Sequence, residues 1–250
     1  MRVIQRIGTE ARAATTTFLR RRTAVMFTFV FPLLLVLIFG ALISTEPGDG
    51  GLFTEEPAYY LPGYLAVVVL FTPLSRLAAE VIRQRTANRF EKLATTPLTR
   101  AEWLVAHTLV TAALVTIASV LIIAVLAVVA GTPIPRSPLI LVFIVLAVTV
   151  FSGIGACLGR IARTQDGAIA AANTLALPLL FLAETFIPPT FFPTWFQPVI
   201  PFLPLTPFTT GVRSLITGSG SWLPELGFIT LLAIVFFTLG AAVLPRAETD

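Results

Sequence analysis

Residues 80–102 read EVIRQRTANRFEKLATTPLTRAE and form a charged stretch between two long apolar segments. The stretch holds Lys92, the only lysine of the chain, and is too densely charged to enter the hydrocarbon core of a membrane. A charged helical element between two membrane spans offers a surface on which a cytoplasmic partner can act. The apolar segments on either side of this stretch indicate which class of protein the chain belongs to.

The composition of the chain indicates an integral membrane protein. Of its 250 residues, 56% are hydrophobic and 12% are charged, whereas soluble domains carry about 25% charged residues. A water-soluble core of this size could not hide so much apolar surface, so we expect a single all-α transmembrane domain over residues 1–250. The single cysteine, Cys157, excludes an intramolecular disulfide.

Six apolar segments are long enough to cross a bilayer, because its core of about 30 Å takes about 20 helical residues. The sequence predicts six transmembrane helices over residues 24–43, 59–79, 103–130, 139–158, 167–186 and 223–244.

The basic residues predict the orientation of these spans. All of them except Arg136 and Arg213 fall on one side of the six-span topology. Because Lys and Arg are retained in the cytoplasm, we expect a multi-pass protein of the cell membrane with both termini inside. The same distribution explains the net charge of +4 without nucleic acid as a partner. A cleaved signal peptide is the competing interpretation, but the first apolar run exceeds the usual 7–15 residues and no A-x-A-like site follows it.

The first 22 residues carry an apolar stripe with helical spacing. Such a stripe between arginines predicts an amphipathic helix over 1–22 that lies in the headgroup plane. A loose basic tail that only enforces topology is the alternative. The stripe consists of Ile4, Ile7, Ala11, Ala14 and Phe18.

The charged stretch contains signals that end one helix and begin another. Pro97 lacks an N–H and restricts Thr96, so it stops the preceding helix. The pattern from Thr99 to Glu102 fits a capping box, which places the start of the third span at Thr99 or Arg100. The residues before it, 80–94, are then expected to form a short separate helix, with a solvated connector as the alternative. Its apolar side chains are Val81, Phe90 and Leu93.

The segment 187–222 is apolar and contains seven prolines. A straight span is excluded, because lipid cannot satisfy so many broken backbone hydrogen bonds. We expect an extracytoplasmic re-entrant or interfacial hairpin, with aromatic residues at headgroup level. It acts either as a plain outer loop or as a lid over an exit path, which makes Phe192 and Trp195 candidates for that path.

Five polar or small residues inside the spans have specific expected roles. Glu184, near the outer end of the fifth span, either faces a substrate path or reaches the headgroups. Asn173 is mid-span, where it can hydrogen-bond across helices and is a second candidate for the path. Gly155 and Gly159 form a G-x-x-x-G pattern that favours close helix packing within one subunit over a dimer seam. The lone histidine, His107, is expected to be a packed polar group rather than a metal ligand.

Three stretches, in their order along the chain, resemble the permease subunits of ABC-2 type ABC transporters. The first is NRFEKLATTPLT over 88–99, with Glu80 before it and Glu102 after it; Asn88 and Arg89 stand where the family often has Gly and Thr. The second is GIGACLGRIARTQ over 153–165. The third runs from FFP at 191–193 through LPLTPF at 203–208 to Gly211 and Arg213.

The resemblance implies an exporter built from separate subunits. Two permeases would pair as a homo- or heterodimer in the lipid bilayer, and each would dock a cytoplasmic ATP-binding subunit. The coupling helix would be the helix around residues 85–94, within a cytoplasmic coupling loop over 80–98, and the N-terminal helix would belong to the same docking surface. The expected coupling residues are Glu80, Arg83, Arg85, Arg89, Phe90, Glu91, Leu93 and Pro97.

ATP and Mg²⁺ would belong to the partner, because this chain has no G-x-x-x-x-G-K-[ST] loop. We therefore expect no catalytic residues, no metal and no cofactor on the chain itself. A self-sufficient secondary transporter or channel, and a membrane scaffold, are the alternatives. The first usually carries mid-span charges or an inverted repeat, and neither is visible here. Drugs, lipids and glycans all remain possible substrates.

Overall fold

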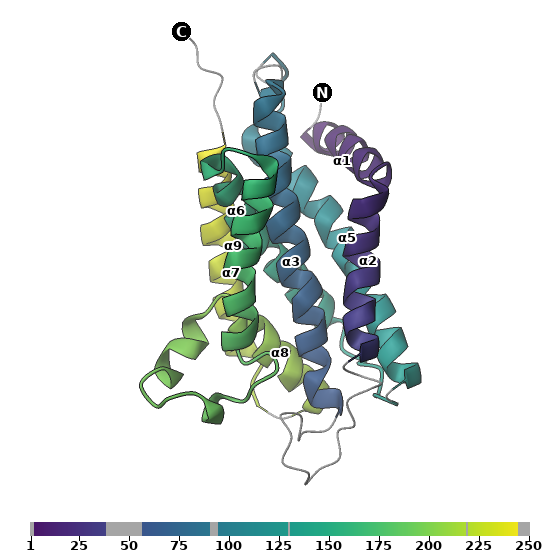
Figure 1. Ribbon diagram of the computed structural model, residues 1–250, viewed down its shortest axis with the longest axis vertical. Helices are drawn as coiled ribbons and strands as arrows, with labels where there is room; N and C mark the ends of the chain where they lie inside the picture. The colour runs from purple at the N-terminus through teal and green to yellow at the C-terminus, as the bar shows by residue number, and fades with distance from the viewer. Residues whose placement is uncertain (1–2, 39–56, 91–94, 130, 219, 245–250) are drawn as a thin grey trace.

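The computed structural model describes residues 3–38, 57–90, 95–129, 131–218 and 220–244. Regular structure in these ranges is helical, and the long helices run side by side along the longest axis of the molecule (Figure 1). The all-α membrane architecture is therefore confirmed.

Five described helices are long and apolar enough to cross a membrane. They coincide with the second to sixth expected spans and confirm them. The helices are α3 (Pro57–Thr86), α5 (Arg100–Val129), α6 (Leu139–Ile161), α7 (Gln165–Leu182) and α9 (Leu223–Val243).

The first expected span begins as helix α2 (Arg22–Leu37), which lies beside α3 and α5 (Figure 1). Its 16 residues are shorter than a bilayer requires. Residues 39–43 of that span lie outside the described ranges, so the count of six stays a prediction.

Helix α3 occupies the centre of the bundle and packs against α2, α5, α6, α7 and α8 (helix α8, Thr206–Thr217). Its Leu65, Leu70 and Leu74 are fully buried, as expected for a helix with neighbours on every side. Pro62 and Pro73 lie inside α3, where neighbouring helices can meet the freed backbone groups.

The expected separate helix over 80–94 is wrong at its N-terminal end, because α3 continues through Glu80 to Thr86. No helix breaker lies between these residues, and Arg83 and Gln84 both donate to the Glu80 carboxylate at helical spacing. The helix ends at a turn over Ala87 and Asn88, where Asn88 adopts a left-handed φ of 51°. A new helix begins at Arg89; residues 91–94 lie outside the described ranges.

The capping box is confirmed at the start of α5. The backbone N–H of Thr99 donates to Oε2 of Glu102 at 2.8 Å, and the N–H of Glu102 donates to Oγ1 of Thr99 at 3.2 Å. Two otherwise unpaired backbone donors are satisfied in this way. Helix α5 begins at Arg100, as predicted.

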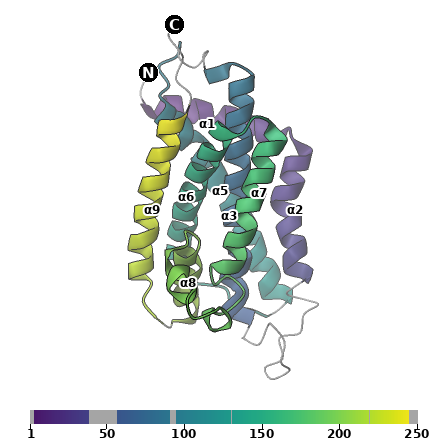
Figure 2. The ribbon, with the colours of Figure 1, turned by 60° about the vertical axis from the view of Figure 1, so that its left-hand side comes forward.

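Helix α1 (Val3–Leu19) crosses the end of the bundle (Figure 2). Ala14 and Phe18 from its apolar stripe are buried against Val110 and Leu114 of α5. Ile4, at the other end of the stripe, is 82% exposed. The expected helix is thus confirmed, and its apolar stripe is buried in its second half. We call this end, with the C-terminal ends of α3 and α6 and the N-terminal ends of α5 and α7, the basic end.

The proline-rich segment folds at the opposite end, which we call the hairpin end (Figures 1 and 2). It consists of the short 3₁₀ helices η2 (Pro189–Phe191) and η3 (Gln197–Phe202), followed by α8. Helix α8 packs against α3, α6 and α9, and its Phe208 and Val212 are fully buried. The segment therefore turns back into the bundle, as a re-entrant hairpin does.

Glycines on α6 bring three backbones close together. A Cβ at Gly155 would lie 2.6 Å from the carbonyl oxygen of Leu74, and one at Gly159 would lie 2.5 Å from that of Ala78, both on α3. On the other face, a Cβ at Gly153 would lie 2.1 Å from the carbonyl oxygen of Phe236 on α9. The G-x-x-x-G pattern therefore serves packing within the subunit, as predicted.

Gly159→Val should destabilise the bundle, because the new side chain would overlap the α3 backbone. We expect a loss of about 1–3 kcal/mol, measured as a lower thermal midpoint of the detergent-solubilised protein. Gly227→Val is the matched control, since a Cβ there meets no described atom within 4 Å. Equal midpoints for the two variants would contradict the packing role of Gly159.

Candidate functional site

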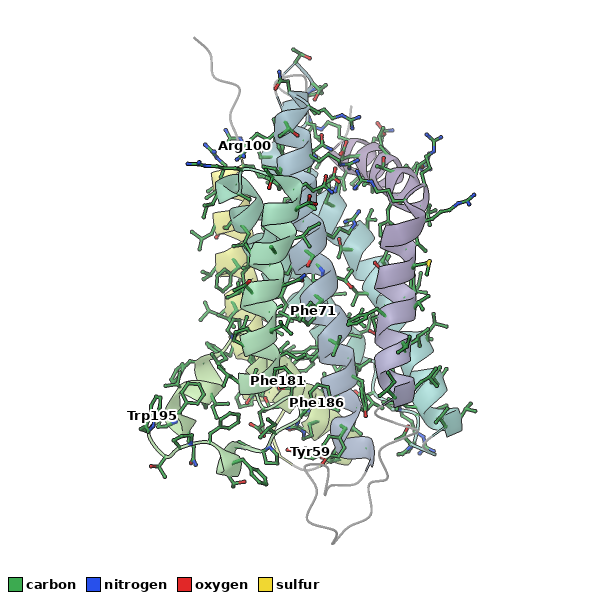
Figure 3. All side chains as sticks on the ribbon, in the orientation of Figure 1. Tyr59, Phe71, Arg100, Phe181, Phe186 and Trp195 are labelled. Carbon is green, nitrogen blue, oxygen red and sulfur yellow. The ribbon has the colours of Figure 1, made fainter. Side chains whose placement is uncertain are left out.

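A cavity of about 830 Å³ opens at the basic end. Helix α3 forms its floor, α2 and α7 form its walls, and α1 with Arg21 closes its top. Its deep part reaches Phe71, which lies near the middle of α3 (Figure 3). Phe31 of α2 and Asn173 of α7 line opposite walls and are both exposed, so the cavity is open along one side.

The mouth of this cavity is charged. The guanidinium of Arg83 pairs with the carboxylate of Glu80, and Nε2 of Gln84 donates to the same carboxylate at 2.7 Å. One turn further down α3, Nη1 of Arg76 donates to Oγ1 of Thr111 at 2.6 Å. The Arg76 guanidinium also lies 5.6 Å from the ring centroid of Phe18, a cation–π distance. These contacts fix two arginine side chains on the cavity floor.

A smaller cavity of about 300 Å³ lies beneath α1 and is also lined by Glu80 and Arg83. Its other lining residues include Glu10 of α1, His107 of α5 and Arg89 of the loop. The Glu80–Arg83 pair therefore stands at the boundary between the two cavities.

Two polar links tie α1 to α5 and to the loop before it. Arg6 donates to Oε1 of Glu102 and to the carbonyl oxygen of Pro97, both at 2.6 Å. Nε2 of the buried His107 hydrogen-bonds Oε1 of Glu10 at 3.1 Å. His107 is thus a packed polar group, as expected, and the described residues contain no cluster of three or more metal-binding side chains.

An aromatic stack extends the His107–Glu10 contact to the helix that begins at Arg89, which we call the loop helix. The ring centroids of Trp103 and His107 are 4.1 Å apart, and Phe90 meets Trp103 edge-on at 5.4 Å. Phe90 and Trp103 are both buried. The stack connects the loop helix, α5 and α1 through side-chain contact.

The structure separates the expected coupling residues into different places. Glu80 and Arg83 face the cavities, and Arg85 donates to the carbonyl oxygens of Arg160 and Ala162, which joins α3 to the turn between α6 and α7. Arg89 and Pro97 are exposed and Phe90 is buried. Glu91 and Leu93 lie outside the described residues.

The expected path residues are also divided. Asn173 lines the large cavity and accepts a hydrogen bond at 3.3 Å from Oγ of Ser75 on α3, which gives the expected contact across helices. Glu184, Phe192 and Trp195 lie at the hairpin end, and Trp195 is 75% exposed (Figure 3).

Glu184 takes part in a cluster that joins α7, α8 and α3. Nη1 of Arg213 lies 3.1 Å from Oε1 of Glu184, and Nη2 donates to the Glu184 carbonyl oxygen at 2.8 Å. The same guanidinium stacks on the ring of Tyr59 at 4.1 Å. Burial raises the pKa of the Glu184 carboxyl; Arg213 opposes this shift, and Glu225 adds to it.

Sequence reasoning did not assign this role to Arg213, nor cavity roles to Arg21 and Arg76. For Arg213 a signal existed, because it is one of only two basic residues expected on its side of the membrane. Arg21 and Arg76 belong to segments that contain other arginines, so nothing in the sequence distinguishes them from their neighbours.

Arg213→Gln should destabilise the hairpin end by about 2–3 kcal/mol, because it leaves the Glu184 carboxylate half-buried without its cation. Limited proteolysis of residues 187–202 and the thermal midpoint measure the effect. The double variant Arg213→Gln/Glu184→Gln should recover part of the loss, whereas Arg136→Gln, at an exposed position of the same end, should cost little. Additive losses in the double variant would contradict the pairing.

A family model described as "ABC-2 type transporter" matches residues 6–217, which extend from α1 to the end of α8. No curated protein matches the chain.

Proposed function

The chain belongs to the ABC-2 type transporter family, and from this premise we propose that it is the permease subunit of an exporter driven by a separate ATP-binding subunit. The match across residues 6–217 carries the proposal. The substrate crosses the cell membrane through the helical bundle. ATP and Mg²⁺ are bound by the partner, and this chain contributes no cofactor site.

The basic end is the side on which the ATP-binding subunit docks. It carries the arginine-rich segments, which are retained in the cytoplasm. The described residues between α3 and α5, 87–90 and 95–99, lie at this end, where Pro97 accepts a hydrogen bond from Arg6 of α1. Among the expected coupling residues that the structure describes, Arg89 and Pro97 have the exposure that a docking contact requires, and Arg89 carries a charge.

Two connections support the idea that a movement of the docked subunit is transmitted to the cavity. The first is covalent: the loop follows directly on α3, and α3 forms the cavity floor. The second is the stack of Phe90, Trp103 and His107, which ends at Glu10 of α1. Phe90 acts here as an internal anchor of the loop, and the Glu80–Arg83 pair as part of the cavity wall.

A second permease copy completes the transporter. The open side of the large cavity lies between α2 and α7, whose outward faces expose Phe31 and Asn173. A second copy facing this side would enclose the path that one chain leaves open. The partner copy is either identical or a related chain.

Arg89→Glu should abolish co-purification of the ATP-binding subunit from native membranes in mild detergent, because it reverses a charge on the docking surface. The wild-type chain should retain one ATP-binding subunit per permease. Arg136→Glu, an exposed charge reversal at the hairpin end, is the control and should retain the partner. Absence of any ATP-binding subunit in the wild-type preparation would instead favour a self-sufficient transporter or a scaffold.

Phe90→Ala should uncouple transport from ATP hydrolysis, because it removes the anchor of the loop on Trp103. Hydrolysis by the reconstituted complex is expected to continue while export falls several-fold. Export at the wild-type rate per ATP would argue against the aromatic stack as the coupling contact.

The hairpin end should face the outside of the cell. In a Cys157→Ser background, Trp195→Cys should react with a membrane-impermeant maleimide on intact cells, whereas Arg89→Cys should react only after permeabilisation. Both side chains are exposed, so accessibility itself is matched. The reverse pattern of labelling would invert the proposed orientation.

A further inference from the structure

The large cavity is amphipathic along its length. Arg21, Arg76 and Arg83 line it toward the basic end, and Phe31 and Phe71 line its walls further down. On α3, Arg83 and Phe71 are twelve residues apart, which corresponds to about 18 Å of helix. The cations thus lie toward the basic end, where Phe18 also meets Arg76, and Phe31 and Phe71 line the cavity further along α2 and α3.

The charged end has more cations than anions. Among the lining residues only Glu80 carries a carboxylate, and that carboxylate is shared between Arg83 and Gln84. Within the described part of the chain, Nε of Arg83 is buried and without a hydrogen-bond partner. A half-buried guanidinium group with an unsatisfied donor is stabilised by an anion that accepts from it.

The electrostatics of Arg21 agree with this excess. Burial lowers the pKa of its guanidinium, Arg83 lowers it further, and Glu80 only partly opposes the shift. Arg21 lies in the connection between α1 and α2, directly above the cavity. An anion between Arg21 and Arg83 would relieve their mutual repulsion.

We propose that this cavity binds an anionic amphiphile, with its acidic group between Arg21, Arg76 and Arg83 and its apolar chain along Phe31 and Phe71. A volume of about 830 Å³ is within the range of small-molecule sites. In the single chain, before a second copy encloses it, the open side between α2 and α7 gives a chain-bearing molecule lateral access. A cation would meet repulsion here, and a neutral molecule would leave the guanidinium groups without a counter-charge.

This inference names the substrate class of the exporter and to that extent rests on the proposed function. Binding itself requires neither ATP nor the partner subunit, so it is measured on the purified full-length chain in a neutral maltoside detergent. The probes are a fluorescent phosphatidic acid and a fluorescent diacylglycerol with the same chains, which differ only in the phosphate. Glycerol phosphate, added as a competitor, tests whether the anion alone is sufficient.

Phosphatidic acid should bind at least about tenfold more tightly than diacylglycerol, equivalent to about 1.4 kcal/mol. Arg21→Gln should remove most of this preference, and Arg21→Lys should retain part of it. Arg20→Gln is the matched control: Arg20 is adjacent and exposed but does not line the cavity, so binding should stay at the wild-type level. Phe31→Ala should weaken the phosphatidic acid complex, whereas Phe181→Ala, at an exposed position away from the cavity, should not.

Three results would overturn the proposal: equal binding of the two probes, equal loss in Arg21→Gln and Arg20→Gln, or displacement of the probe by glycerol phosphate. The last result would reveal a plain anion site. The outcome is separable from that of the proposed function. If the chain binds the probe selectively but co-purifies with no ATP-binding subunit, the binding site is supported and the exporter function is not. If the chain co-purifies with the subunit but does not prefer phosphatidic acid, the exporter function is supported and the anionic ligand is not.

Discussion

Close approach of α6 to α3 and α9 is the constraint on which the rest of the bundle depends. Between membrane helices the hydrophobic effect offers little attraction, since lipid chains are as apolar as leucine side chains. Helices then associate by van der Waals contact, which is strongest where small residues bring backbones together. Gly155 and Gly159 provide this contact toward α3, and Gly153 provides it toward α9. With α3 and α9 fixed on α6, the remaining helices have a rigid centre to pack on.

At the two ends of this apolar bundle, several polar side chains pair with residues from other elements. At the basic end, Arg6 and His107 join α1 to α5; at the hairpin end, Arg213 joins α8 to Glu184. Each of these contacts bridges segments that are far apart in the sequence. The charges thus help to fix the positions of α1 and α8, two described helices that lie outside the predicted spans.

The elements that depend on local sequence were predicted best. The capping box depends on Thr99 and Glu102, which are three positions apart, and the membrane spans depend on the length of the apolar segments. Both can be recognised in the sequence alone. The predicted end of α3 lies too early, because the charges after Ala79 indicate the end of a span, whereas Glu80 and Arg83 pair on the helix and extend it. The large cavity was not predicted, because its charged end forms only when the α1–α2 connection, α3 and α7 meet, and no pattern within any one of them specifies that meeting.

Helix α3 is longer than a bilayer is thick. Its 30 residues extend about 45 Å, whereas the hydrocarbon core measures about 30 Å. Its tight contact with Gly155 and Gly159 involves Leu74 and Ala78, in the C-terminal half of that length. Pro73, beside this contact, lacks one backbone hydrogen bond of the helix. A helix that pivots about this contact moves its two ends in opposite directions: a tilt that carries the Thr86 end one way carries the Tyr59 end, with the ring on which Arg213 stacks, the other way.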